Sequence, residues 1–305
     1  MDMFSIMEKV GTLFALIIIG LVFGKLARTT EKDTQLLAKV VLNVVVPANI
    51  IASVRMADFD SIKQDLLALV IISCCVLAFT LALAFLFTRL LKMEGATAGV
   101  YRSAVFFNNY GFMGWPVCFI IFGAQGLLYA VLYTIPMNVF LYTFTPMMLA
   151  GKTKRAFDLK LLINMPLVST VIAVLLLVFS VTPPDLLGDV FEMVGAVQTP
   201  LSMIIVGMVL ASADLKKLMN GAAPYLYSAV RLVVIPAALF LVLKWAGGFG
   251  LILGIPVIIA AMPAATMVVV LSQNYDSDTV LASRLVIIST LFSIVTIPLF
   301  AMLVL

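Results

Sequence analysis

The sequence predicts an all-α membrane protein with ten transmembrane helices in two inverted five-helix repeats, in which two broken helices, spans 4 and 9, cross. Three observations lead to this fold class. Of the 305 residues, 64% are hydrophobic and 11% are charged, and the mean hydropathy is +1.20. Soluble domains are far less apolar. The chain also divides into ten apolar windows, each near the roughly twenty residues that cross a bilayer. Finally, two windows contain residues that break helices.

The ten windows are joined by short polar loops. They cover residues 10–27, 36–54, 66–88, 95–122, 126–150, 161–182, 193–213, 222–243, 249–273 and 279–305. We expect residues 1–150 to form the first repeat, 151–160 a cytoplasmic linker and 161–305 the inverted second repeat. The first window lacks the basic start and small-residue cleavage site of a signal peptide, so it is expected to be span 1.

Proline spacing favours the repeat. Three pairs of residues in corresponding windows recur at a spacing of 152 or 153 residues: Pro47 and Pro200, Pro146 and Pro298, and Gly111 and Pro263. Two consecutive halves of five spans each must have opposite orientations, which is the condition for an inverted repeat.

The Lys and Arg residues indicate the orientation. If the N-terminus is outside, the inner loops hold twelve of these residues and the outer loops hold four. Because basic loops remain in the cytoplasm, we expect a multi-pass protein of the cell (inner) membrane. Both termini should lie on its outer side.

The fourth window contains the stretch YRSAVFFNNYGFMGWPVCFI, residues 101–120, which is wrong for a plain transmembrane helix. Asn108 and Asn109 are polar, Gly111 lowers the cost of leaving the helix, and Pro116 cannot donate to the helical ladder. Non-helical backbone at membrane depth is tolerated where it lines a cavity. Transporters bind their substrates at such broken helices, so we expect a substrate site here.

The ninth window, IPVIIAAMPAATMVVVL, has Pro263 near its centre. Four alanines flank this proline on its two sides, and small residues allow another backbone to approach closely. The window therefore suits a second broken helix that crosses the first.

Polar residues elsewhere in the windows leave more than one interpretation. Asn43 and Asn49 flank Pro47 and are expected to form interhelical hydrogen bonds. Asn138 and Tyr142 share one face of window five, where either an interhelical bond or a role in the site is open.

Charged residues at membrane depth limit the mechanism. All fifteen carboxylates lie in loops or at span ends, which argues against a proton or sodium relay of buried acids. Arg284 is expected to snorkel to the interface, and Arg231 to bind helix-end carbonyls or a lipid phosphate. For Arg102 the same interpretation and a role in an anion's inner access path both stay open.

Other function classes find little support. The chain has no His, no buried carboxylate pair and no set of metal ligands, so we expect no enzyme, no catalytic residue, no metal and no cofactor. It also has no basic patch interleaved with aromatic residues, so no nucleic acid is expected as a partner.

Two stretches resemble the auxin efflux carrier family. The segment NYGFMGWP, residues 109–116, is similar to that family's fourth-span pattern N-x-x-x-M-G-x-P. The segment AAMPAATMVVVLSQNYDSD, followed by STLFSIVTIP, is similar to its ninth and tenth spans. The resemblance covers the whole chain. It implies a scaffold of spans 1, 2, 6 and 7, a transport domain of spans 3–5 and 8–10, and a homodimer through the scaffold.

The resemblance also implies residue roles. The anion's carboxylate is expected near Asn109 and the half-helix N-termini, and Tyr142 matches a span-five tyrosine that contacts substrate in the plant exporters. Where those exporters have a glutamine, this chain has Met137, which departs from the auxin site. Span three also lacks the acidic and basic pair that those exporters carry there.

The expected function is secondary transport of a small organic anion, an auxin-like or mono- or dicarboxylic acid. We expect alternating access around the crossover by rocking or elevator motion of one subdomain. The expected partners are that anion and the lipid bilayer. The expected substrate-binding residues are Asn108, Asn109, Tyr110, Gly111, Pro116, Asn138, Tyr142, Met262, Pro263 and Ala264, with Arg102 on the access path.

Two alternatives stay open. One is a sodium-coupled symporter of the bile-acid type, although window nine is nearly bare of oxygen ligands before Ser272 and Gln273. The other is a membrane sensor of organic acids that transports nothing.

Overall fold

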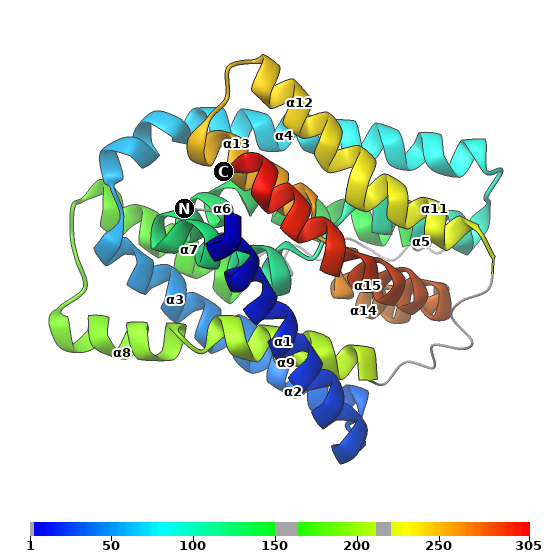
Figure 1. The fold of residues 1–305 in the computed structure, drawn as a ribbon, viewed down its shortest axis with the longest axis horizontal. Coiled ribbons are helices and arrows are strands. Elements are labelled where there is room, and N and C mark those ends of the chain that lie inside the picture. Colours follow the sequence, from blue (N-terminus) through cyan, green and yellow to red (C-terminus); the bar gives the residue numbers. More distant parts are fainter. Residues whose placement is uncertain (1–2, 150–163, 212–220) are drawn as a thin grey trace. The chain divides into compact units, whose positions relative to one another are not determined.

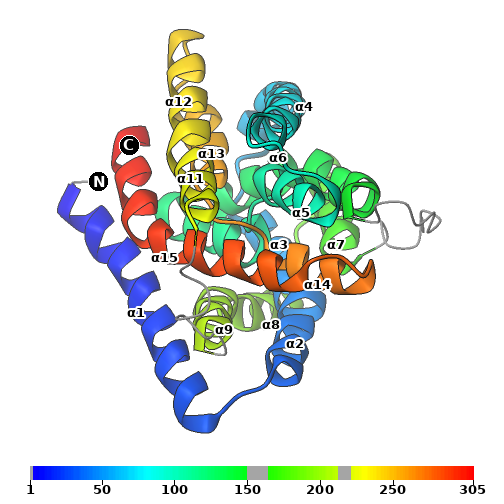
Figure 2. The same cartoon turned by 90° about the vertical axis from the view of Figure 1, so that its right-hand side faces the viewer.

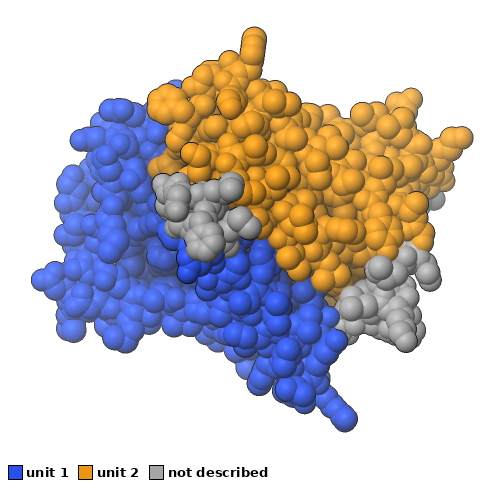
Figure 3. All heavy atoms as spheres, viewed as in Figure 1, with its two compact units in different colours: residues 1–67, 111–132, 163–214 blue, residues 68–110, 133–162, 215–305 orange. Residues whose placement is uncertain are grey.

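The computed structural model describes residues 3–149, 164–211 and 221–305, and all regular elements within these ranges are helices (Figure 1). This confirms the predicted all-α class. The expected linker 151–160 lies outside the described residues. Contacts divide the chain into two compact units, coloured separately in Figure 3: residues 1–67, 111–132 and 163–214 form unit 1, and residues 68–110, 133–162 and 215–305 form unit 2.

Unit 1 contains the helices of the first two predicted spans and of the sixth and seventh. Its helices are α1 (Met3–Ala27), α2 (Glu31–Val40), η1 (Val41–Val45), α3 (Val46–Ser53), η2 (Val54–Met56), α7 (Met165–Val178), α8 (Asp185–Gly195) and α9 (Gln198–Ala211). It also holds the start of α4 (Phe59–Leu90), the first part of α6 (Trp115–Leu149) and most of η3 (Tyr110–Gly114).

Unit 2 contains the rest of α4 and α6 together with the helices of the later spans. These are α5 (Gly95–Phe106), α11 (Ala223–Ala229), η5 (Val230–Val234), α12 (Ile235–Trp245), α13 (Gly250–Ala260), α14 (Thr266–Asn274) and α15 (Thr279–Val304).

Within the described ranges, seven helical stretches are long and apolar enough to cross a membrane. They are Glu8–Ala27, Lys32–Met56, Phe59–Leu90, Tyr110–Leu149, Asp185–Ala211, Ala223–Trp245 and Thr279–Val304. Two shorter apolar helices, α7 and α13, come in addition. The chain is thus a helical membrane protein, while the count of ten spans and their arrangement as an inverted repeat stay predictions.

Three π-helical turns interrupt the long helices, and each is followed by a proline. The turns η1, η3 and η5 end one residue before an α-helix whose second residue is Pro47, Pro116 or Pro236, respectively. A proline lacks the N–H group and its ring crowds the carbonyl one turn earlier. Widening the preceding turn accommodates both effects, and such π-turns are frequent at functional sites. The prolines therefore explain why the regular α-helical hydrogen bonding is interrupted at these places.

Helices α1 and α9 pack along each other in unit 1 (Figure 2). Gly20 of α1 faces the backbone of α9, and Gly207 of α9 faces the backbone of α1. A Cβ atom on Gly20 would lie 2.1 Å from the Ile204 carbonyl oxygen, and one on Gly207 would lie 2.0 Å from the Ile17 carbonyl oxygen. Small residues that let backbones meet are typical of helix pairs in membranes.

Two asparagines of unit 1 differ in role although both flank Pro47. Asn49 is buried and donates to the Gln198 side-chain oxygen of α9 over 2.6 Å, as an interhelical bond. Asn43 is exposed and donates to the Lys39 carbonyl of its own helix over 2.8 Å, so its expected interhelical bond was wrong.

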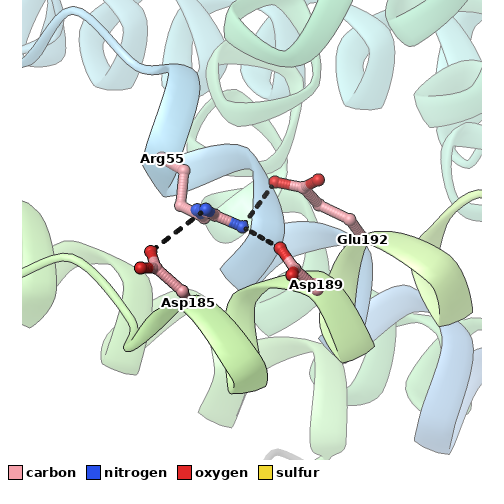
Figure 4. A network of polar contacts seen from close by, with 4 residues as sticks. All are labelled: Arg55, Asp185, Asp189 and Glu192. Carbon is pink, nitrogen blue, oxygen red and sulfur yellow. Dashed lines mark hydrogen bonds and ion pairs between the residues drawn. The ribbon is translucent and has the colours of Figure 1, made fainter.

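An ion network joins η2, the short turn after α3, to α8. The Arg55 guanidinium lies 3.0 Å from both Asp189 and Glu192, and 3.6 Å from Asp185 (Figure 4). The lack of a side chain at Gly188 leaves room for Arg55, because a Cβ there would lie 2.5 Å from Nη1. A network of one cation with three acids is expected to matter more than an isolated surface pair.

Replacing Arg55 by Met is expected to lower the melting temperature at low salt and to reverse its dependence on salt. In the wild type, salt weakens the attraction between Arg55 and the acids, whereas in the variant salt screens the repulsion among the three remaining carboxylates and so raises the melting temperature. Thermal unfolding at low and high ionic strength measures both effects. Lys63→Met, which removes an exposed cation, is the control. Equal melting temperatures for the two variants would mean that the network contributes nothing.

Candidate functional site

Two helices of unit 2 break at the predicted places, and their breaks meet. Helix α5 ends at Phe106, and α13 ends at Ala260 with α14 starting only at Thr266. The extended residues between these ends pair in antiparallel fashion through a bridge between Asn108 and Ala264. We call residues 107–109 and 261–265 the crossover.

Backbone hydrogen bonds hold the crossover together. The Asn109 amide donates to the Pro263 carbonyl over 2.8 Å, and the Ala265 amide donates to the Phe107 carbonyl over 3.3 Å. The Ala264 amide donates to Ser289 Oγ of α15 over 3.1 Å. Because unpaired peptide groups are costly at membrane depth, these bonds are what allow both helices to unwind here.

The helix ends at the crossover also have partners for their last carbonyls. Asn108 Nδ2 donates to the Ile259 carbonyl at the end of α13. The Tyr227 hydroxyl donates to the Ala104 carbonyl in the last turn of α5 over 3.0 Å. The last carbonyls of a helix receive no N–H group from within the helix, so they need donors from elsewhere. Asn108 thus caps a helix through its side chain, and its contact with the substrate stays a prediction.

Asn109 differs from Asn108 in this respect. Its side chain is 4% exposed, and its Nδ2 atom has no hydrogen-bond partner among the described residues. The neighbouring helix α14 begins with Thr266 and Met267, whose amides have no acceptor within that helix. The crossover therefore presents one buried side-chain donor without an acceptor among the described residues, and it leads directly into the N-terminus of α14.

Tyr110 and Asn138 form a pair beside the crossover. The Tyr110 hydroxyl donates to Asn138 Oδ1 over 2.8 Å, and Asn138 Nδ2 donates to the Thr134 carbonyl over 3.2 Å. The predicted site residue Asn138 is thereby fixed against the segment that follows Asn109. The side chain of Tyr142 lies outside the described part of the chain.

Comparison with known proteins identifies the family. The model of the family described as "Membrane transport protein" matches residues 5–156 and 151–301, which together cover nearly the whole chain. The protein belongs to this family, the auxin efflux carriers.

Curated relatives span the full length of this auxin efflux carrier family member. A Methanothermobacter thermautotrophicus protein named "Uncharacterized transporter" is 29% identical over 304 residues, covering 96% of this chain and 97% of the relative. A Methanocaldococcus jannaschii protein, also named as an uncharacterized transporter, is 25% identical, with coverage of 96% and 97%. A Rhizobium meliloti protein named "Putative malonate transporter" is 24% identical, with coverage of 93% and 91%.

Not every predicted site residue of this carrier lies at the crossover. Met262, Pro263 and Ala264 are buried within it, as the break in the ninth window required. Gly111 and Pro116 belong to unit 1, at η3 and at the start of α6. A Cβ atom on Gly111 would meet no atom within 4 Å.

Arg102 is half-buried and turns toward α4. Its Nε atom donates to Thr88 Oγ1 over 2.9 Å, and its guanidinium carbon lies 4.5 Å from the centre of the Phe85 ring. These contacts fix Arg102 within unit 2 as a link between two helices. Its predicted role on an access path stays a prediction.

Sequence reasoning missed two polar residues beside the crossover, Ser289 and Tyr227, and the burial of a third, Arg231. Ser289 receives the Ala264 amide, Tyr227 caps α5, and Arg231 is 1% exposed with its Nη1 atom 3.5 Å from the Val105 carbonyl. Arg231 does bind a helix-end carbonyl, as one of its expected interpretations had it. Its burial was not expected, although a charge in an apolar window was the available signal.

Proposed function

We propose that this carrier is a secondary transporter that binds a carboxylate of a small organic anion at the crossover. The observation that carries the proposal is the buried Nδ2 group of Asn109, which has no acceptor within the described residues. An unmade hydrogen bond of a buried donor costs about 1–3 kcal/mol. A ligand that accepts this bond removes the cost, so the site favours an acceptor.

The helix ends favour a negatively charged acceptor. The N-terminus of α14 carries partial positive charge, equivalent to roughly half an elementary charge. Its first amides lie next to Ala264 and Ala265 of the crossover. A carboxylate satisfies both the amide of Asn109 and this potential. The name of the Rhizobium relative, "Putative malonate transporter", supports the same chemical class.

The helix content of the two units supports a division into scaffold and transport domain. Unit 1 holds α1–α3 and α7–α9, and unit 2 holds the crossover with α5 and α11–α15. We infer that unit 2 carries the anion by an elevator motion, and that unit 1 is the scaffold through which a homodimer forms.

The span count of ten belongs to the same proposal. The stretch Tyr110–Leu149 has 40 residues, or roughly 60 Å as a helix, twice the thickness of a hydrocarbon core. Gly123 divides it, with φ of 71° and ψ of −162°, a conformation that suits glycine. We count two spans in this stretch, one broken span from α13 and α14, and one span from α7. With the six other long apolar stretches they make ten spans. Both termini then lie on the outer side of the inner membrane.

The experiment that tests the function combines binding with flux. Purified protein is expected to melt at higher temperature with carboxylates, because a ligand of the folded state stabilises it by mass action. Proteoliposomes loaded with the stabilising anion are expected to release it faster than protein-free vesicles. Binding without flux would indicate a sensor, and flux that requires sodium would indicate the symporter. Neither binding nor flux with any carboxylate would overturn the proposal.

A further inference from the structure

Arg231 is a buried cation of unit 2 to which the proposed site at the crossover assigns no role. It lies in η5, the π-turn before Pro236. This turn joins α11 to α12, the yellow helices of Figure 1. Its side chain makes one long hydrogen bond, from Nη1 to the Val105 carbonyl at 3.5 Å. Its Nε and Nη2 atoms are buried and have no partner within the described residues. Since arginine remains protonated in proteins, the buried charge is left without compensation.

No carboxylate of the described residues pairs with Arg231. The ion pairs within the described ranges all involve Arg55 of unit 1. The described acids of unit 2 lie at its loops: Glu94 precedes α5, and Asp276 and Asp278 precede α15. A buried charge without a partner is expensive. Since the described residues supply no counter-charge, its presence favours an anionic ligand.

The two unpartnered atoms, Nε and Nη2, indicate which kind of anion Arg231 binds. In a guanidinium group, the N–H bonds of Nε and Nη2 lie parallel along one edge. This edge donates two hydrogen bonds to the two oxygens of a carboxylate, which is the bidentate geometry that arginine prefers. The atom already in use, Nη1, lies off this edge. Arg231 thus holds its carboxylate-binding edge open while its other end is tied to α5.

Neighbouring side chains add a donor and a connection to the crossover. Tyr133 lies within electrostatic reach of Arg231, is fully buried, and its hydroxyl also has no partner among the described residues. Tyr227 also interacts electrostatically with Arg231, and its side chain hydrogen bonds to Ser289. Ser289 in turn receives the Ala264 amide. The cation is therefore connected to the crossover through three consecutive contacts.

We propose that Arg231 and the Tyr133 hydroxyl form a second carboxylate subsite in unit 2, so that the preferred ligand carries two carboxylates. One binds at Asn109 and the α14 N-terminus, and the other binds along the Nε–Nη2 edge of Arg231. This inference rests on the proposed function. If Arg231 only capped the end of α5, that role would explain the bond of Nη1 to the Val105 carbonyl. It would not explain why the Nε and Nη2 donors are buried without acceptors.

The test compares dicarboxylates with monocarboxylates of matched length. Malonate, succinate and glutarate are titrated against propionate, butyrate and valerate, with wild type, Arg231→Gln, Arg231→Lys and Tyr133→Phe. Arg231→Gln is expected to weaken binding of the best dicarboxylate about 10- to 100-fold, the range of hydrogen bonds to charged groups. Its monocarboxylate affinity is expected to stay within about 2-fold. Arg231→Lys keeps the charge without the fork and should lose less.

Ligand-free stability provides a second readout. Removing an uncompensated buried charge should leave the melting temperature of Arg231→Gln equal to or above that of wild type. A cap of α5 would instead lower it. If Arg231→Gln does not fold, the dicarboxylate selectivity of Arg231→Lys and Tyr133→Phe decides, and it is expected to fall in both.

The outcomes separate this inference from the proposed function. Equal losses for mono- and dicarboxylates in the Arg231 variants would mean one subsite, and unchanged affinities would mean a structural cap; either result overturns the second subsite. If Asn109→Ala weakens all anions while Arg231→Gln weakens none, the proposed function stands without it. A wild-type protein that binds none of the six anions would refute the proposed function itself.

Discussion

Asn109→Asp is expected to weaken carboxylate binding more than 100-fold while the protein remains folded. The two side chains have the same shape, but the substitution replaces the unpartnered N–H donor of the crossover with a negative oxygen. The lost bond accounts for about 1–2 kcal/mol. Repulsion between two carboxylates about 4 Å apart adds up to about 4 kcal/mol at an effective dielectric constant near 20. Each 1.4 kcal/mol is a factor of ten in affinity.

Asn109→Ala isolates the lost hydrogen bond and should weaken binding about 5- to 30-fold. Equilibrium titration with a stabilising anion measures both variants, and the melting temperature without ligand reports folding. Asn43→Ala is the matched control, because Asn43 bonds only its own helix through Lys39. Unchanged affinity in both Asn109 variants would place the anion elsewhere and leave the crossover as a hinge.

Gly207→Ala is expected to abolish most of the folded protein, as is Gly20→Ala. In each case one methyl group would overlap a backbone oxygen of the facing helix, at 2.0 Å for Gly207 and 2.1 Å for Gly20. Overpacking of flexible side chains typically costs 1–3 kcal/mol. Two helix backbones cannot yield as side chains do, so we expect at least about 3 kcal/mol here. Helices α1 and α9 would have to separate.

The yield of monodisperse protein in detergent and its melting temperature measure this effect. Gly11→Ala is the control on the same helix, because a Cβ there meets no atom within 4 Å. It removes the same conformational freedom without the close approach. If Gly207→Ala and Gly11→Ala melt alike, α1 and α9 do not rely on this contact.

The helix breaks could be predicted from the sequence because their causes are local. Pro263 interrupts the ninth window by itself, and Asn108 with Asn109 cannot remain in lipid-facing helix. The residue at which the first helix breaks was harder to predict. Gly111 and Pro116 suggested a break around themselves, but α5 already ends at Phe106, and Pro116 acts through the π-turn before it. Tertiary hydrogen bonds to Pro263 and Ala265 set that end.

The partners of the polar side chains could not be predicted. Asn43 and Asn49 both lie within one helical turn of Pro47, yet one bonds its own helix and the other bonds Gln198, 149 residues away. Windows that are apolar on every side do not show which face meets protein and which meets lipid. For the same reason Arg231 could be assigned to a lipid phosphate, whereas in the structure it is 1% exposed.

The unpaired cation in unit 2 has an electrical consequence. Moving one elementary charge through the membrane changes its energy by about 2.3 kcal/mol per 100 mV. An empty unit 2 with charged Arg231 would be drawn toward the negative inside of the cell, and the same unit loaded with a dianion would be drawn outward. If unit 2 moves as proposed and releases its ligand outside, the resting voltage drives both the outward step of the loaded unit and the inward return of the empty unit. The membrane potential alone would thus favour export.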